Sequence, residues 1–193
     1  MNNVLNLIPE RDVASELFDL QKEQLEHDSK YHRDICILNV HQRMNHYALH
    51  FAKYSGYFVE ALRLSDNEKF CQAIVDSFII TLATANTLNV DLGANADKMT
   101  DGGELIGYDR YKTDENDRLP FVLSFVETTG RLAKACESVD HLEPYPFRQE
   151  MTSCAKSILY LVMKQSSTLD LDLPKETRKR LATVKERNIF HNR

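Results

Sequence analysis

The 193-residue sequence is poor in residues that interrupt helices, with only 6 glycines and 5 prolines. No segment alternates apolar and polar residues as a β-strand does, whereas long stretches place apolar residues three and four apart. These patterns predict an all-α fold, a helical bundle that forms one domain over residues 1–193. A chain of this length buries enough surface to fold without disulfides or a structural metal.

The short motifs of many catalytic sites are also missing. There is no glycine-rich phosphate loop, no nucleophile elbow and no Cys/His dyad. The cysteines have no zinc-binding spacing, so we expect them to be reduced and buried: Cys36, Cys71, Cys136 and Cys154. The start lacks the pattern of a signal peptide, and the apolar stretch 73–92 is too polar to span a membrane. We therefore expect a cytoplasmic protein with no membrane partner.

The formal net charge of −5 argues against general nucleic-acid binding. The charge is uneven, because residues 174–193 hold seven Lys or Arg against two Glu and so carry +5. Residues 1–173 therefore carry −10. This basic C-terminal segment is either a solvated helix face, or it docks on the acidic body or contacts phosphate.

Apolar periodicity predicts six helices, over residues 11–30, 36–64, 68–88, 120–137, 147–169 and 174–188. Ser65 is the expected N-cap of the third helix, since an acid follows three residues later. The buried stripe expected on the second helix is Met44, Ala48, Phe51, Ser55, Phe58 and Leu62, with Tyr47 and Val59 beside it. Residues 93–118 hold four of the glycines among many charges, which indicates a connector.

The two halves of the chain are similar to each other. Residues 50–61 align with residues 124–135, so that Phe51, Gly56 and Ala61 match Phe125, Gly130 and Ala135. A second apolar helix follows in each half, and each half ends in Asp-Leu. We infer a tandem repeat, about 44–92 and about 122–173. The halves should pack as a pseudo-twofold four-helix bundle, with Gly56 and Gly130 at close helix contacts.

The repeated helix pair resembles that of MazG-like pyrophosphohydrolases and the related dimeric dUTPases. In that family one helix carries a Glu-Glu-x-x-Glu-like pattern around a glycine, and the next carries Glu-Glu-x-x-Asp and ends in Asp-Leu. Those carboxylates hold Mg²⁺ ions that bridge the phosphates of a nucleotide. The resemblance implies an α-helical fold, a possible homodimer, and a second half that is structural.

Most of the family's acidic positions are occupied by other residues in this chain. Around Gly56 they are Lys53, Tyr54 and Tyr57, and on the next helix they are Gln72 and Ala73. The second half has Thr128, Arg131, Ser153, Cys154 and Ser157 at such positions. Two carboxylates remain, Asp76 and Glu127, and nearby Lys53 and Arg131 would repel a cation. These substitutions therefore predict no metal site at these positions.

One polar strip on the second helix is the main candidate site. Spacings of three and four place its members on one face: Arg43, His46, His50, Lys53 and Tyr57. This strip is either a solvated polar face or an anion-binding surface, with Lys53 where the family has metal. His46 and His50 at i, i+4 can chelate Zn²⁺, but no third ligand is evident.

Further candidates lie elsewhere in the chain. Arg131 is a further candidate for phosphate binding. The resemblance implies the same role for Lys185, Arg187 and Asn188 near the C-terminus, where the alternative is a helix end at which cations are favoured by the helix dipole. His27–Asp28 is similar to the His-Asp pair of metal phosphohydrolases, but nothing downstream completes that pattern, so we expect no metal there.

Three functions are compatible with these observations. The first is binding of a nucleotide or similar phosphorylated small molecule without hydrolysis, in a sequestering or sensing role. The second is an active NTP or dNTP pyrophosphohydrolase with Mg²⁺ held by a rearranged site. It would use Asp76 and Glu127 and recruit Glu60 or Glu150. The third is a protein-interaction module that kept only the helical scaffold.

Overall fold

The computed structural model describes residues 13–95 and 118–187, and within them all regular structure is helical. The α-helices are α1 (Val13–Tyr31), α2 (Arg33–Cys36), α3 (Val40–Leu64), α4 (Asn67–Leu88), α6 (Leu119–Asp140), α7 (Phe147–Thr168) and α8 (Leu173–Arg187). A single 3₁₀ turn, η1 (Gly93–Asn95), follows α4. The all-α class predicted from the sequence is confirmed.

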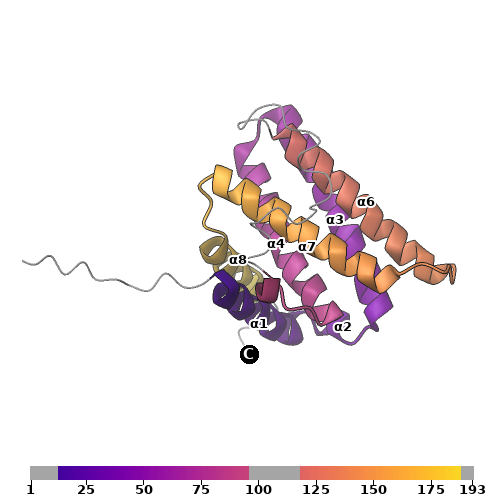
Figure 1. Ribbon diagram of the computed structural model, residues 1–193. Coiled ribbons are helices and arrows are strands. Elements are labelled where there is room, and N and C mark those ends of the chain that lie inside the picture. The colour runs from indigo at the N-terminus through magenta and orange to yellow at the C-terminus, as the bar shows by residue number, and fades with distance from the viewer. Residues whose placement is uncertain (1–12, 96–117, 188–193) are drawn as a thin grey trace, which may run out of the picture.

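Four long helices form the bundle, as two hairpins packed side by side (Figure 1). The α3–α4 hairpin contacts the α6–α7 hairpin through α3 on α6 and through α4 on α7. A 2.8 Å contact between His41 Nε2 and Asp140 Oδ1 joins the start of α3 to the end of α6. Arg148 Nη2 donates to the Leu88 carbonyl at 2.7 Å and joins the start of α7 to the end of α4. Corresponding helices of the two hairpins therefore run antiparallel.

Equivalent positions of the inferred repeat contact each other where α3 crosses α6. Ser55 and Thr129, which match in the sequence comparison, lie 3.2 Å apart at their hydroxyl oxygens. The matched rings of Phe51 and Phe125 have centroids 6.2 Å apart. A twofold axis between the hairpins would produce such self-matched contacts. The duplication itself stays a prediction, which these contacts support.

A cluster of phenylalanines fills the centre of the bundle. Phe58 meets Phe70, Phe121 and Phe125 with ring centroids 4.9–5.1 Å apart, mostly edge to face. All four rings are fully buried. Aromatic pairs in this geometry contribute about 0.5–1.5 kcal/mol each beyond the burial of their area. The two hairpins are thus held together by contacts that lie far apart in sequence.

Helix α4 is the central element, since it contacts α1, α3, α7 and α8. Among the described helices it is also the one long and apolar enough to cross a membrane. However, 61% of that stretch is buried inside the protein, as in the core helix of a folded domain. The apolar character of α4 is therefore explained by packing.

The two ends of the described chain meet on the outside of α4. Helices α1 and α8 both contact α4 and each other (Figure 1). Arg178 of α8 forms ion pairs with Glu16 and Glu23 of α1 at 2.8 and 2.9 Å. The basic C-terminal helix thus docks on an acidic part of the body, one of the outcomes left open by the sequence.

Two predicted helix boundaries are wrong. Instead of one helix over 36–64, α2 ends at Cys36 and α3 begins at Val40. Asn39 starts α3, because its side chain accepts from the Gln42 amide at 2.9 Å in a capping box. Asp66, and not Ser65, is the N-cap of α4, accepting from the Lys69 amide at 2.9 Å. Ser65 instead closes α3 with a positive φ of 54°.

The prediction that Gly56 and Gly130 lie at close helix contacts is wrong. Both glycines are exposed, and a Cβ added at either would meet nothing within 4 Å. Gly93 is the close contact, because a Cβ there would lie 2.4 Å from the Ala14 carbonyl oxygen. The repeat does place Gly56 and Gly130 at matching positions, but on the outer face.

The buried face of α3 is also rotated from the predicted stripe. It consists of Met44, Tyr47, Phe51, Tyr54, Phe58 and Ala61. Ala48, Ser55 and Leu62 are half-buried, and Val59 is 53% exposed. The rotation arises because α3 packs against α4 as well as α6, which buries the tyrosines on the α4 side.

Only part of the cysteine prediction is correct. All four thiols are free, as expected, but only Cys136 and Cys154 are buried. Burial raises the pKa of Cys136 to about 11 and that of Cys154 to about 12. Cys36 and Cys71 are half-buried. The two in the second half are therefore packing residues with little thiolate character.

Candidate functional site

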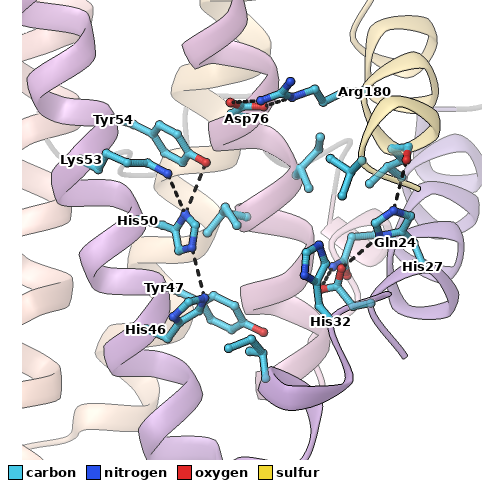
Figure 2. Close-up of a pocket in the computed structure, with 16 residues that line it drawn as sticks. Gln24, His27, His32, His46, Tyr47, His50, Lys53, Tyr54, Asp76 and Arg180 are labelled. Atoms are coloured by element: carbon cyan, nitrogen blue, oxygen red, sulfur yellow. Dashed lines mark hydrogen bonds and ion pairs between the residues drawn. The ribbon is translucent and has the colours of Figure 1, made fainter. Parts of the chain in front are cut away.

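A cavity of about 270 Å³ lies between α3, α4 and the pair formed by α1 and α8 (Figure 2). We call it the α3–α8 pocket. Its polar lining is Gln24, His27, Asp28, His32, His46, His50, Lys53, Asp76 and Arg180, together with the hydroxyl-bearing rings of Tyr47 and Tyr54. Its apolar lining is Ile35, Ile79, Ile80, Leu181 and Val184. The pocket therefore combines several converging polar groups with an apolar wall, as small-molecule sites do.

Helix α3 supplies a hydrogen-bonded chain of side chains along one wall (Figure 2). Lys53 Nζ lies 3.2 Å from His50 Nδ1, and the Tyr54 hydroxyl lies 3.4 Å from the same atom. An ammonium group can only donate, so His50 Nδ1 accepts and the ring proton lies on Nε2. That proton points to His46 Nε2, which is 3.1 Å away. The chain therefore fixes the tautomers of both histidines.

Both histidines of this wall are held neutral. Burial lowers the pKa of His50 to about 4, and the charge of Lys53 acts in the same direction. Burial also lowers the pKa of His46. The neighbouring Tyr54 hydroxyl has its pKa raised, again by burial first. At neutral pH this wall thus offers one full positive charge, Lys53, beside neutral hydrogen-bonding groups.

One end of the pocket, next to Tyr54, holds an ion pair between α4 and α8 (Figure 2). Arg180 Nε donates to Asp76 Oδ1 at 2.7 Å, and Arg180 Nη2 donates to Asp76 Oδ2 at 3.1 Å. The Asp76 side chain is only 15% exposed. Hydrogen bonding to Asp76 raises the pKa of Arg180. Both oxygens of Asp76 are therefore bonded to a permanent internal cation.

Helix α1 contributes the third wall, at its C-terminal end. His27 and Asp28 lie in its last turn, and His32 follows directly after Tyr31. One ligand atom from each of His27, Asp28 and His32 lies within 4.8 Å of the other two. Gln24, which is 1% exposed, donates to Asp28 Oδ2 at 2.5 Å. This wall is therefore also polar and internally hydrogen-bonded.

The structure brings some of the predicted site residues together. His46, His50 and Lys53 line the α3–α8 pocket, and so does Asp76. Arg43 and Tyr57 of the same strip do not line it. The Arg43 Nε atom is buried and has no hydrogen-bond partner among the described residues, and the Tyr57 ring lies 5.1 Å from Lys69 Nζ. Only the middle of the strip, His46 to Lys53, therefore lines the cavity, and its two ends do not.

The remaining predicted residues lie elsewhere. Arg131 forms an ion pair with Glu150 between α6 and α7, and Glu127 lies on α6 outside the pocket lining. Lys185 and Arg187 are exposed on α8, and Arg187 borders a separate cavity between α4 and α8. Asn188 and most of the connector lie outside the described residues. Asp76 and Glu127 therefore do not line a common cavity.

Several residues of the pocket did not emerge from the sequence. Arg180 was visible only as one of many basic residues in the C-terminal segment, and Gln24 carried no signal. His27 and Asp28 are adjacent in the sequence, whereas His32 follows four residues after Asp28 and beyond the end of α1. The spacing His-Asp-x₃-His across a helix end was the available signal, since residues four and five apart lie about one helical turn from each other and so place His32 near Asp28 and His27.

Comparison of the chain with protein-family models, with curated proteins and with solved structures gives no match. The likeness to MazG-like pyrophosphohydrolases therefore remains an expectation from the sequence.

Proposed function

We propose that this chain binds a small phosphorylated molecule in the α3–α8 pocket and does not hydrolyse it. The observation that carries the proposal is Lys53. Its ammonium lines the pocket and contacts His50, yet within the described residues it forms no ion pair with a carboxylate. A cation that has no direct carboxylate partner beside a cavity attracts anions, and phosphate oxygens accept hydrogen bonds from such groups.

Neighbouring groups favour an anionic, hydrogen-bonding ligand. The Tyr54 hydroxyl and the imidazoles of His46 and His50 lie along the same wall as Lys53. These groups bond a phosphate without adding negative charge of their own. The apolar lining offers a surface for an organic part of the ligand, such as a base or sugar.

The absence of hydrolysis is supported by the pairing of Asp76. A Mg²⁺ ion needs carboxylate oxygens that are free to coordinate it. Both Asp76 oxygens accept from Arg180, and Glu127 does not line the pocket. Arg180 thus supplies the positive charge that a metal would supply in the resembled family.

The size of the cavity favours a small ligand. A volume of about 270 Å³ lies just below the range of about 300–1,000 Å³ that is usual for small-molecule sites. We therefore expect a monophosphate or diphosphate to bind better than a nucleoside triphosphate.

A thermal-shift screen in the presence of a metal chelator tests this function. The panel contains orthophosphate, pyrophosphate, nucleoside and deoxynucleoside mono-, di- and triphosphates, and sugar phosphates. A ligand at 100 times its dissociation constant stabilises the folded state by about 2.7 kcal/mol, which raises Tm by several degrees. No stabilisation by any member would contradict the proposal and favour an interaction protein.

A further inference from the structure

The His27, Asp28 and His32 side chains form a compact group at the end of α1, which we call the HDH cluster. Helix α1 ends at Tyr31, and the His32 amide donates to the Asp28 carbonyl at 2.9 Å. This turn places His32 beside His27, with the two ring centroids 5.7 Å apart. The result is two imidazoles and one carboxylate beside the α3–α8 pocket.

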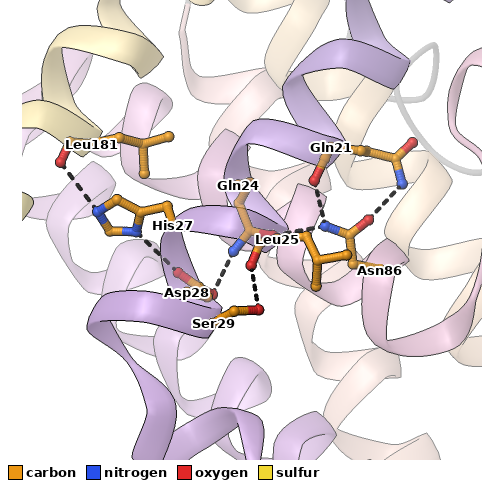
Figure 3. A network of polar contacts seen from close by, with 8 residues as sticks. All are labelled: Gln21, Gln24, Leu25, His27, Asp28, Ser29, Asn86 and Leu181. Carbon is orange, nitrogen blue, oxygen red and sulfur yellow. Dashed lines mark hydrogen bonds and ion pairs between the residues drawn. The ribbon is translucent and has the colours of Figure 1, made fainter.

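The hydrogen bonds of His27 define which of its nitrogens is free to bind an ion. His27 Nε2 lies 3.2 Å from the Leu181 carbonyl oxygen, which can only accept, so Nε2 carries a proton (Figure 3). The other nitrogen, Nδ1, faces Asp28 Oδ1 at 3.3 Å. A lone pair facing a carboxylate oxygen is repulsive unless a cation lies between them. A metal ion bound to both atoms would remove this repulsion.

Asp28 is held in place by a buried amide network (Figure 3). Gln24 Nε2 donates to Asp28 Oδ2, and Asn86 Nδ2 donates to Gln24 Oε1 at 2.8 Å. Asn86 is itself fixed by Gln21, whose Nε2 donates to Asn86 Oδ1 at 3.1 Å. Gln21 and Gln24 are both buried. This network occupies one carboxylate oxygen and leaves the other, Oδ1, directed at His27.

The geometry points to a divalent transition-metal site formed by His27 Nδ1, Asp28 Oδ1 and the His32 ring. Metal-bound histidines usually donate their second ring N–H to a carbonyl, and bound carboxylates are usually hydrogen-bonded in turn. His27 has such a carbonyl partner in Leu181, and Asp28 accepts a hydrogen bond from Gln24. Two histidines and one carboxylate suit Zn²⁺, Fe²⁺ or Co²⁺ and leave coordination positions open.

Coordination requires a modest closure of the HDH cluster. Bonds of about 2.0–2.2 Å place neighbouring ligand atoms about 3–3.5 Å apart. The present maximum separation is 4.8 Å, so His32 would move inward by roughly 1–2 Å in this tighter geometry. His32 is the N-cap residue of α2, and its side chain makes no capping hydrogen bond that would oppose this movement.

Neighbouring charges permit a cation at this position. Arg180 lines the same pocket, but its charge is compensated by Asp76. His46 and His50 are neutral. Lys53 is the remaining cation of the lining, and it is directed toward His50 on the opposite wall (Figure 2). The metal site does not rest on the proposed phosphate binding, since it uses different residues.

Calorimetric titration of the metal-free, full-length chain with Zn²⁺ tests the site, in buffer without phosphate. We expect one ion to bind per chain, and at least tenfold weaker binding in both His32→Ala and Asp28→Asn. The matched control is His141→Ala, an exposed histidine outside the pocket, which should bind as the wild type does. Circular dichroism verifies that each variant is folded.

Co²⁺ provides a second measurement that does not depend on heat. Bound Co²⁺ should give visible absorption bands that disappear in His32→Ala and persist in His141→Ala. A wild-type chain that binds no better than His32→Ala would overturn the proposal. Binding that is lost instead in His46→Ala/His50→Ala would also overturn it, by moving the site to α3. Because the phosphate screen contains a chelator, either proposal can fail alone.

Discussion

The Arg180 guanidinium binds both carboxylate oxygens of Asp76, at 2.7 and 3.1 Å, across the contact between α8 and α4. Asp76 is the one acidic residue on α4 at a position where the resembled MazG-like helix carries a metal ligand. The internal cation therefore stabilises this carboxylate without a metal. It also connects the C-terminal helix to the pocket.

Arg180→Ala should destabilise the protein by about 1–3 kcal/mol, because it leaves a largely buried carboxylate unpaired. The loss should be below the 3–5 kcal/mol of a fully buried pair, since Arg180 is 28% exposed. Urea denaturation measures the change, and Arg187→Ala on the same helix should stay within about 0.5 kcal/mol. A double-mutant cycle with Asp76→Asn should recover a coupling of about 1–3 kcal/mol. Purely additive losses would show that the pair contributes nothing.

Hydrolysis of nucleoside and deoxynucleoside triphosphates should not occur with Mg²⁺ or Mn²⁺. The reason is that Asp76 is already paired with Arg180, and that most positions at which the resembled family carries acidic residues hold other residues in this chain. Release of pyrophosphate from a broad substrate panel is the measurement. Robust turnover that disappears in Asp76→Asn would contradict this account and establish an active pyrophosphohydrolase.

Gly56→Ala and Gly130→Ala should each stabilise the protein by about 0.5–1 kcal/mol. Both glycines lie inside helices with open space around them, and alanine lowers the entropy cost of forming the helix. Gly93→Ala is the contrasting variant, since its Cβ would clash with the Ala14 backbone, and it should destabilise. Chemical denaturation compares the three. Destabilisation by Gly56→Ala would indicate that another chain packs on this outer face.

Acidification should weaken the fold through His50. Its pKa is about 4 in the folded chain and about 6.5 when unfolded, so between these values the unfolded state binds more protons. Stability should therefore fall as the pH drops from about 6.5 to about 4. After discounting for partial exposure, this contribution is about 1–2 kcal/mol. His50→Gln should flatten this part of the pH profile in metal-free buffer, whereas His141→Gln should not.

Local patterns predicted most helices but not their junctions. The boundaries of α1, α4, α6, α7 and α8 lie within a few residues of prediction, because apolar spacing reports directly on a buried helix face. The break before α3 was not predicted. It is marked by the N-cap Asn39 and not by a glycine or a proline, and apolar spacing does not report on such a cap. The glycines were misassigned because a small residue fits an exposed face and a close contact equally well.

The pocket was predicted only in part, for a different reason. His46, His50 and Lys53 belong to one helix, so their spacing placed them on one face. Their partners come from α1 and α8, near opposite ends of the described chain, and a long-range contact leaves no local periodicity. The division of the strip, with Arg43 and Tyr57 outside the pocket, likewise depends on where those two helices pack.

Lys53→Glu tests the central claim most directly, through titration calorimetry with orthophosphate, pyrophosphate and the deoxynucleoside monophosphates. The matched control is Lys22→Glu, which makes the same charge change at an exposed lysine of α1 outside the pocket. We expect at least one of these compounds to bind the wild type and the control alike. We expect Lys53→Glu to bind it at least about tenfold more weakly, a loss of 1.4 kcal/mol or more, with unchanged circular dichroism. Equal binding by Lys53→Glu, Lys22→Glu and the wild type would contradict the account.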